Sequence, residues 1–346
     1  MRYKLLGRSG LRVSELGLGA MIFGAEGNGG ARREDCGRIV EAFAEAGGNF
    51  IDTADAYGSG TSERIVGELV AAERDSFVLA TKYTLSRDPR DPNAAGNHRK
   101  SLVHALDASL ERLRTEYVDL LWVHIWDFFT PVEEVMRALD DQVRAGKVLY
   151  VGISDTPAWI IARANTIAEQ RGWTPFTAVQ AQYSLVERTV ERELVPMAQA
   201  LDLAFTAWSP LAHGVLSGKQ NGRGARNATE RNLGIAREVG EIAAELDATA
   251  SQVALAWLQT RPGVVLPIFG ARTEEQLRDN LGAVDVELSP DQLARLDELS
   301  AIPLGFPHEF ITRVRASTSV LGDALERIDD HRAERSGLPL PGSPLS

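Results

Sequence analysis

The chain has 346 residues, of which 44% are hydrophobic, and its 48 acidic and 37 basic side chains give a net charge of −11. This balance argues against a general nucleic-acid-binding surface, although a local basic pocket for an anionic ligand is compatible with it. The single cysteine, Cys36, excludes an intramolecular disulfide, and no apolar run approaches the ~20 residues of a membrane-spanning helix. Because residues 1–4 also lack a signal-peptide core, we predict a cytoplasmic protein with neither nucleic-acid nor membrane partners.

Strand and helix patterns alternate along the chain. A hairpin at 3–5 and 11–13 is expected to close the floor of a barrel. Eight strands follow, at 14–21, 49–52, 77–82, 118–124, 148–154, 178–183, 204–208 and 264–267. Helices between and after them are expected at 34–46, 61–72, 98–113, 131–145, 156–170, 189–201 and 273–281, with extra helices at 249–260 and 290–300. Eight strand-then-helix units predict an α/β fold, a (β/α)8 TIM barrel, rather than an open sheet.

We expect one domain, 1–346, with no internal boundary. The barrel occupies about residues 3–300, and a C-terminal extension covers 301–346. Its tail from about residue 337 is rich in Pro, Gly and Ser, which predicts irregular structure.

Four chemically capable side chains lie at the ends of successive strands: Asp52, Tyr57 five residues later, Lys82 and His124. The carboxyl ends of barrel strands share one face, so these side chains are expected to converge. A lysine ammonium lowers a phenol pKa from its usual ~10, and a carboxylate holds that lysine in place. A neutral histidine positions a carbonyl oxygen beside the phenol. The set suits protonation of an alkoxide as a hydride reaches carbon, and nothing in it resembles a metal site.

Each of these residues also has an ordinary structural interpretation. Asp52 is compatible with a helix cap or a turn, Tyr57 with loop packing, and a lone His124 with a structural role. Their shared position on one barrel face favours the catalytic interpretation.

The dinucleotide fingerprint Gly-x-Gly-x-x-Gly is absent, because the Gly17–Gly19 pair lacks the third glycine and the helix that follows it. The later strands offer another way to bind a dinucleotide. Ser154 and Gln180 suit a carboxamide, and Trp208 offers a flat surface for a nicotinamide ring. The glycine-rich stretch 209–232 is expected to close over a pyrophosphate, with a solvated insertion as the alternative. Arg272 at a helix N-terminus suits a phosphate monoester.

The chain resembles the aldo-keto reductases over about residues 3–300. The matching segments are 50–58, 80–82, 119–124, 146–148, 151–154, 179–184, 207–211 and 270–273, with Gln276 and Asn280. The resemblance implies a (β/α)8 barrel, NADPH as hydride donor, and a catalytic tetrad of Asp52, Tyr57, Lys82 and His124. It also implies cofactor contacts at Gly19, Ala20, Met21, Asp52, Ser154, Gln180, Trp208, Ser209, Pro210, Leu211, Gly214, Leu216, Lys219, Gly270, Arg272, Thr273, Gln276 and Asn280.

Trp208 indicates the branch that includes bacterial reductases and potassium-channel β subunits, where an aromatic residue stacks on the nicotinamide. Two positions depart from the family pattern. Asp155 stands where many relatives carry Asn, and Phe269 stands where Pro is frequent.

The predicted activity is NADPH-dependent reduction of a small-molecule aldehyde or ketone. A sugar-nucleotide reductase and a slow-turnover regulatory subunit are the alternatives. The substrate is expected to meet Phe23, Tyr57, His124 and Trp126, with Phe128 and Phe129 nearby, although loop packing explains the aromatic residues equally well. Phe306, His308 and Phe310 are placed to cover the mouth. The oligomeric state stays open.

Overall fold

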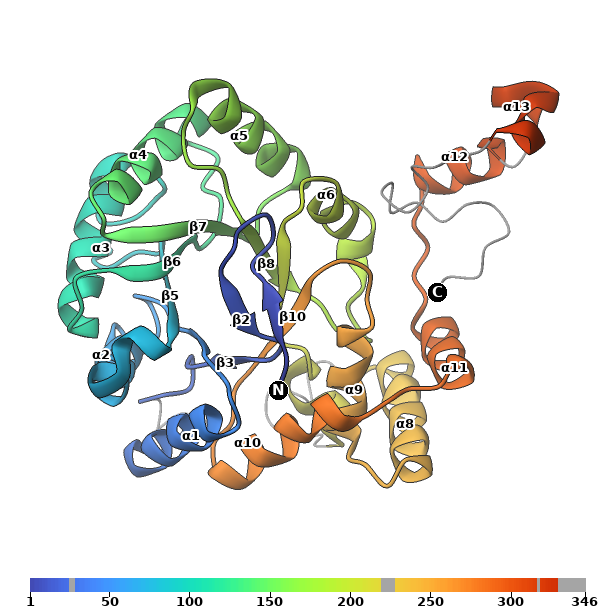
Figure 1. Cartoon of the computed structure of the whole chain (residues 1–346), viewed down its shortest axis with the longest axis horizontal. Coiled ribbons are helices and arrows are strands. Elements are labelled where there is room, and N and C mark those ends of the chain that lie inside the picture. The colour runs from blue at the N-terminus through green and yellow to red at the C-terminus, as the bar shows by residue number, and fades with distance from the viewer. Residues whose placement is uncertain (25–28, 219–227, 316–317, 329–346) are drawn as a thin grey trace.

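Eight parallel strands form a closed barrel in the computed structural model of the chain (Figure 1), in which residues 1–24, 29–218, 228–315 and 318–328 are described. The order around the barrel is β10-β3-β4-β5-β6-β7-β8-β9, so neighbours in sequence are neighbours in space and β10 closes against β3. The strands are β3 (Gly17–Gly19), β4 (Phe50–Asp52), β5 (Val78–Tyr83), β6 (Val118–Val123), β7 (Val148–Ser154), β8 (Ala178–Gln182), β9 (Ala204–Trp208) and β10 (Val265–Phe269). This confirms the predicted (β/α)8 fold.

Helices surround the barrel (Figure 1). The α-helices are α1 (Arg33–Glu45), α2 (Thr61–Val70), α3 (Arg99–Leu113), α4 (Val132–Arg144), α5 (Ala158–Arg171), α6 (Leu194–Ala200), α8 (Glu230–Glu245), α9 (Ala250–Gln259), α10 (Glu274–Leu281), α11 (Pro290–Ser300), α12 (His308–Arg315) and α13 (Thr318–Leu321). Short 3-10 helices are η2 (Ala71–Ser76), η3 (Thr189–Glu191), η4 (Ala212–Ser217), η5 (Gly282–Asp285) and η6 (Gly322–Arg327). Two of the helices begin with capping boxes, at Thr249 and Ser289. In each, the side-chain oxygen of the capping residue accepts from the backbone N–H of the third helical residue, a glutamine, whose own side chain accepts from the backbone N–H of the capping residue.

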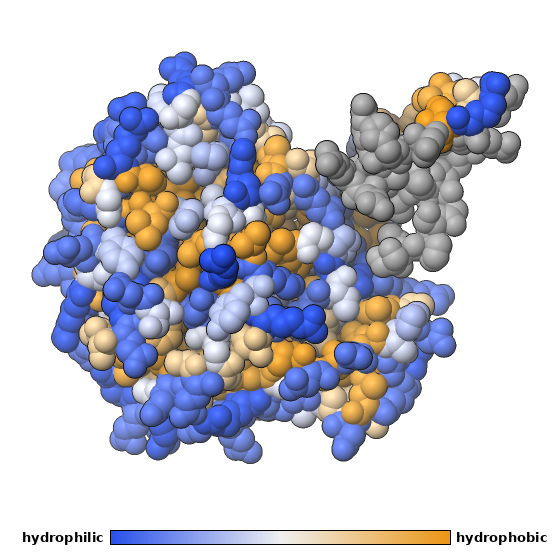
Figure 2. Space-filling view, viewed as in Figure 1, coloured by the Kyte–Doolittle hydropathy of each residue, from blue (hydrophilic) through white to orange (hydrophobic). Residues whose placement is uncertain are grey.

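The N-terminal hairpin of β1 (Tyr3–Leu5) and β2 (Arg12–Ser14) closes one end of the barrel, as predicted. Leu6 and Val13 are fully buried and pack against side chains of the barrel interior. At the tip, Gly7 has φ +55°, and a Cβ there would lie 2.3 Å from the Thr177 carbonyl oxygen, so only glycine fits this approach. The face that carries the hairpin has a hydrophilic rim around a more hydrophobic middle (Figure 2).

The hydrophobic core has two parts, one inside the barrel and one between the barrel and its helices. The interior part contains Phe50, Leu120 and Trp122, each fully buried. Trp122 needs the space beside Gly152, because a Cβ on that glycine would lie 2.4 Å from the indole ring. Side chains fill the interior of the barrel in this way. The barrel is therefore a packed core, and a ligand would bind at its open end.

Three elements differ from the predictions. The first barrel strand is shorter than 14–21, because Ser14 pairs in the hairpin. The helix expected at 189–201 is divided into η3 and α6, since Pro196 lacks the N–H that a continuous helix needs and clashes with the preceding turn. The third, α8, was not predicted, although Thr229 caps it and Ile235, Val239 and Ile242 are buried at helical spacing.

The C-terminal segment leaves the barrel beside α6 and projects outward as α12 and α13 (Figure 1). His308 reaches Glu193 with an N···O distance of 3.1 Å, and Phe306 and Phe310 are 86% and 48% exposed. These three residues therefore do not cover the barrel mouth, contrary to the expectation. Among the described helices, none is both long and apolar enough to cross a bilayer.

Candidate active site

The barrel brings Asp52, Lys82 and Tyr57 together at the carboxyl ends of its strands. Asp52 is the last residue of β4, and Lys82 lies near the end of the adjacent β5. The Lys82 side chain is fully buried, its ammonium donates to the Asp52 carboxylate, and it also donates to the Thr53 carbonyl oxygen at 2.9 Å. A buried lysine requires such partners, because an unpaired ammonium in an apolar core is strongly disfavoured.

Tyr57 and His124 lie on the solvent side of this pair. The Lys82 ammonium is 4.9 Å from the centre of the Tyr57 ring. The His124 ring, which follows β6, stands edge-on to the Tyr57 ring with 5.9 Å between their centres. Both residues are half-buried, and His124 Nδ1 is enclosed with no hydrogen-bond partner among the described residues. The four predicted side chains therefore converge as the sequence indicated.

The electrostatics of the group differ in one respect from the expectation. Burial raises the pKa of Tyr57, and the opposing effect of Lys82 does not overcome it. The expected lowering of this pKa is therefore not present in the protein alone. Burial lowers the pKa of Lys82, but Asp52 and Tyr57 outweigh that effect, so its net shift is upward and the ammonium stays charged. Burial, aided by Lys82, lowers the pKa of His124 to about 3, so the imidazole is neutral near pH 7.

A second charged cluster, which the sequence reasoning missed, lies between β5 and the helices α2 and α3. Glu63 of α2 is fully buried; it accepts from the Thr81 hydroxyl at 2.6 Å and from Arg112 Nε at 2.6 Å. Thr81 precedes Lys82 on β5, so this cluster supports the strand that carries the lysine. Asp55 is 5% exposed, and neither of its carboxylate oxygens has a hydrogen-bond partner among the described residues. The sequence could have indicated Asp55 as a candidate, because it lies within the strand-end segment 50–58.

The later strands place the predicted nicotinamide-site residues side by side. Ser154 pairs in register with Gln180, and both are buried at the ends of β7 and β8. Gln180 Nε2 donates to Asp52 Oδ1 at 3.1 Å, which ties this side of the mouth to the tetrad. Trp208 ends β9, and its indole N–H donates to Asp155 Oδ1 at 3.0 Å. The sequence did not reveal that contact.

The loops after β3 and β10 also meet. A Cβ on Gly270 would lie 3.3 Å from the Gly19 carbonyl oxygen, so the two backbones approach closely. Ala20 is buried and Met21 is 45% exposed at this edge. Arg272 is exposed, and its backbone N–H donates to Gln276 Oε1 at 3.1 Å. Thr273 caps α10, and Asn280 on that helix is buried.

The segment after β9 holds the remaining predicted contacts. Ser209 is in the left-handed region at φ +53°, Pro210 is buried and Leu211 packs against the core. Leu216 is fully buried, so its side chain serves the core, and Gly214 has φ +100° within η4. Lys219 lies outside the described residues, as does much of the expected clamp loop at 209–232.

The aromatic residues predicted for the substrate pocket separate into two groups. Phe23 is fully buried in the core between barrel and helices, and Trp126 is 7% exposed. Phe128 and Phe129, in the loop after β6, are 67% and 92% exposed. The open aromatic surface at the mouth therefore comes from the β6 loop.

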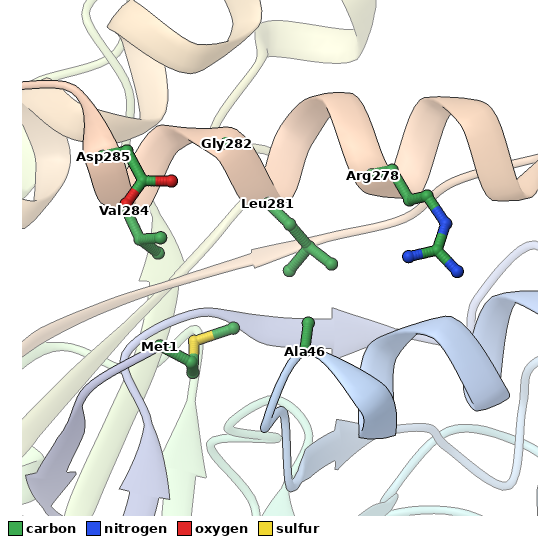
Figure 3. Close-up of a pocket in the computed structure, with 7 residues that line it drawn as sticks. All are labelled: Met1, Ala46, Arg278, Leu281, Gly282, Val284 and Asp285. Atoms are coloured by element: carbon green, nitrogen blue, oxygen red, sulfur yellow. The ribbon is translucent and has the colours of Figure 1, made fainter.

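A hollow of about 350 Å³ lies elsewhere on the molecule (Figure 3). It is lined by Met1, Ala46, Arg278, Leu281, Gly282, Val284 and Asp285. Ala46 ends α1, immediately before the start of β4, so this hollow is at the amino ends of the strands. It is thus opposite the tetrad and holds none of the residues discussed above.

A parallel eight-stranded barrel with a Tyr–Lys–Asp–His group at its carboxyl face defines a carbonyl oxidoreductase. The comparisons agree: the model of the "Aldo/keto reductase family" matches residues 15–301, and the chain belongs to that family. Norsolorinic acid reductase from Emericella nidulans is 40% identical over 318 residues, covering 88% of this chain and 82% of that protein. Aryl-alcohol dehydrogenase [NADP(+)] from Phanerodontia chrysosporium is 37% identical over 331 residues, covering 86% of each chain. The protein is thus an NADP-dependent aldo-keto reductase that reduces an aldehyde or ketone with NADPH.

Proposed function

We propose that Tyr57 is the general acid of this reduction and that Asp52, Lys82 and His124 are its catalytic partners. NADPH supplies the hydride when bound. The Tyr57 hydroxyl gives its proton to the carbonyl oxygen as negative charge develops there, and the Lys82 ammonium stabilises the phenolate left behind. Asp52 keeps that ammonium charged and oriented. The observation that carries the proposal is the buried Asp52–Lys82 pair directly beneath the Tyr57 ring.

His124 fits the task of holding the substrate oxygen. Because the imidazole is neutral near pH 7, one of its nitrogens carries a proton to donate without placing a second cation beside Lys82. A neutral donor binds the carbonyl oxygen and leaves proton transfer to Tyr57. The raised pKa of Tyr57 fits a group that is protonated before the reaction and needs the substrate and cofactor charges to release its proton.

The cofactor is proposed to lie across the later strands. Ser154 and Gln180 would hold the carboxamide, and Trp208 would offer its ring to the nicotinamide. The close approach of Gly19 to Gly270 leaves no side chain between these loops, which suits a ligand backbone. The remaining proposed contacts are Ala20, Met21, Ser209, Pro210, Leu211, Gly214, Leu216, Lys219, Arg272, Thr273, Gln276 and Asn280.

An aromatic aldehyde or ketone is the proposed substrate class. Phe128 and Phe129 are exposed in the loop that follows His124, and Trp126 in the same loop is buried, as is Phe23 after β3. The name of the second relative above, aryl-alcohol dehydrogenase, points to an aromatic substrate for that protein. We also propose that the chain belongs to a branch near the potassium-channel β subunits, and Trp208 supports this placement. The single domain and the cytoplasmic location are likewise proposals.

A substrate panel tests this function. Purified protein is mixed with NADPH and benzaldehyde derivatives, aliphatic aldehydes of equal carbon number, and keto-sugars, and absorbance of NADPH is followed. The proposal predicts steady turnover that is fastest with the aromatic carbonyls. Bound NADPH without turnover indicates the regulatory alternative, and preference for keto-sugars indicates the sugar-nucleotide alternative.

A further inference from the structure

Asp155 occupies an unusual position at the barrel mouth. It follows the last residue of β7 in the left-handed region at φ +43°, and its N–H donates to the Gln180 carbonyl oxygen at 3.1 Å. This turn directs the carboxylate across β8, so that Oδ1 accepts from the Trp208 indole at 3.0 Å. Asparagine and aspartate tolerate that backbone conformation better than most residues. The carboxylate is therefore fixed against the ring that is proposed to hold the nicotinamide.

The carboxylate of Asp155 has no ion-pair partner in the part of the chain that the structure describes. Its side-chain hydrogen-bond partners are the neutral Trp208 and Ser154. The ammonium of Lys82 is the nearest cation that influences it, but Lys82 is already paired with Asp52. The field of Asp155 also reaches Tyr57, where it opposes ionisation.

Opposing influences act on the ionisation of Asp155. The residue is exposed at the mouth, but its carboxyl is partly enclosed, and this burial raises the pKa of Asp155; the opposing effects of the Trp208 hydrogen bond and Lys82 do not overcome it. The hydrogen bond and the cation both favour the charged form. In its ionised form, Asp155 places beside the tetrad and Trp208 a negative charge that has no ion-pair partner among the described residues.

The two forms of the cofactor differ in charge where this carboxylate faces them. The nicotinamide ring of NADP⁺ carries a positive charge, and the ring of NADPH is neutral. We infer that Asp155 sets the preference between the two forms, because its carboxylate stabilises bound NADP⁺ relative to bound NADPH. The inference rests on the proposed cofactor site, and it makes Asp155 a specificity-determining residue for cofactor redox state. By linkage, it also favours the carbonyl-reducing direction in the bound complex, because that direction converts NADPH to NADP⁺.

The size of the effect follows from Coulomb's law. For an assumed separation of about 7 Å, two unit charges change an equilibrium by roughly 3-fold at the dielectric constant of water and roughly 50-fold at an effective value of 20. The mouth is open to solvent, so the lower part of this range applies. We expect a change of about 3- to 10-fold at low ionic strength, decreasing as salt is added.

The test compares wild type with Asp155→Asn, which keeps an oxygen acceptor for Trp208 and removes only the charge. Dissociation constants for NADP⁺ and NADPH are measured separately by titration calorimetry and by quenching of tryptophan fluorescence, at 20 mM and 300 mM salt. Glu41→Gln is the control, since it removes one negative charge from an exposed site on the outer helix α1. NADP⁺ is expected to weaken about 3- to 10-fold relative to NADPH in Asp155→Asn at low salt, and not in Glu41→Gln.

Three results overturn the inference in distinguishable ways. Equal changes in both dissociation constants, or none, show that Asp155 does not discriminate by charge, while the cofactor site stands. A shift of the same size in Glu41→Gln reflects net charge and not this position. If wild type binds neither cofactor, the proposed cofactor site fails together with the inference.

Discussion

The most quantitative prediction concerns the buried carboxyl of Asp55. Burial, followed by repulsion from Glu63, raises its pKa to about 7, against the opposing attraction of Arg112 and Arg87. The ordinary pKa of an aspartate is 3.8, so raising it to about 7 corresponds to about 4 kcal/mol at 1.36 kcal/mol per pKa unit. This carboxyl has no hydrogen-bond partner among the described residues, so the attraction of Arg112 and Arg87 only partly offsets the cost of ionising it.

The sign of the pH dependence follows from proton counts. Between about pH 4 and pH 7 the folded protein holds a proton on Asp55 that the unfolded chain releases. The free energy of unfolding therefore falls as pH rises through this window, with a slope near 1.4 kcal/mol per pH unit from this group. The loss is complete above pH 7 and absent below pH 4.

Asp55→Asn removes this ionisation with little change of shape. Urea unfolding is followed by circular dichroism at half-unit steps from pH 5 to pH 8 for wild type, Asp55→Asn and the control Asp202→Asn. Asp202 is exposed and has φ +53°, a conformation that asparagine accepts. The stability of Asp55→Asn relative to wild type is expected to increase by about 3 kcal/mol across this window. A difference that does not change with pH refutes the reasoning, whatever its constant offset from the buried amide.

Three further substitutions test other parts of the account. Lys82→Met is expected to abolish carbonyl reduction while NADPH still binds, and near wild-type turnover measured by NADPH absorbance contradicts this. Gly152→Ala inserts a methyl 2.4 Å from the Trp122 ring, so we expect it to cost about 1–3 kcal/mol of folding stability and to lower the melting temperature. Gly10→Ala is the control, because no atom lies within 4 Å of its Cβ position, and we expect it to cause no such loss. A stable Gly152→Ala variant with unchanged packing speaks against the described interior. Arg272→Ala is expected to weaken NADPH binding by about 1.5–3 kcal/mol with NADH binding unchanged, and equal effects on both cofactors refute a phosphate contact.

The sequence predicted the barrel because its strands repeat in a fixed order with helices. The strand-end positions of Asp52, Lys82 and His124 followed from that repeat alone, since parallel barrel strands end at one face. The break between η3 and α6 was also readable, because Pro196 forbids a continuous helix there. The missed helix α8 lay within and after a stretch interpreted as a loop on account of its glycines.

Features that depend on tertiary packing were not predictable in the same way. The upward pKa shift of Tyr57 reflects how much protein surrounds the phenol, and the motif alone suggested only the attraction of Lys82. The contact between Asp155 and Trp208 joins residues 53 positions apart, and it depends on a left-handed turn that the sequence does not announce. The outward course of α12 is likewise set by where residues 301–307 leave the barrel, not by its own helical pattern.

The central claim is that Tyr57 donates the proton in a carbonyl reduction carried out at the carboxyl face of this barrel. Tyr57→Phe removes one hydroxyl and keeps the ring against which His124 packs at 5.9 Å. Single-turnover reduction of an aromatic aldehyde is measured beside the dissociation constant for NADPH in the same preparation. The account predicts a loss of at least about a hundredfold in rate, as expected for removal of a general acid, with cofactor affinity within about twofold of wild type. A rate near that of the wild-type protein, at equal NADPH occupancy, contradicts it.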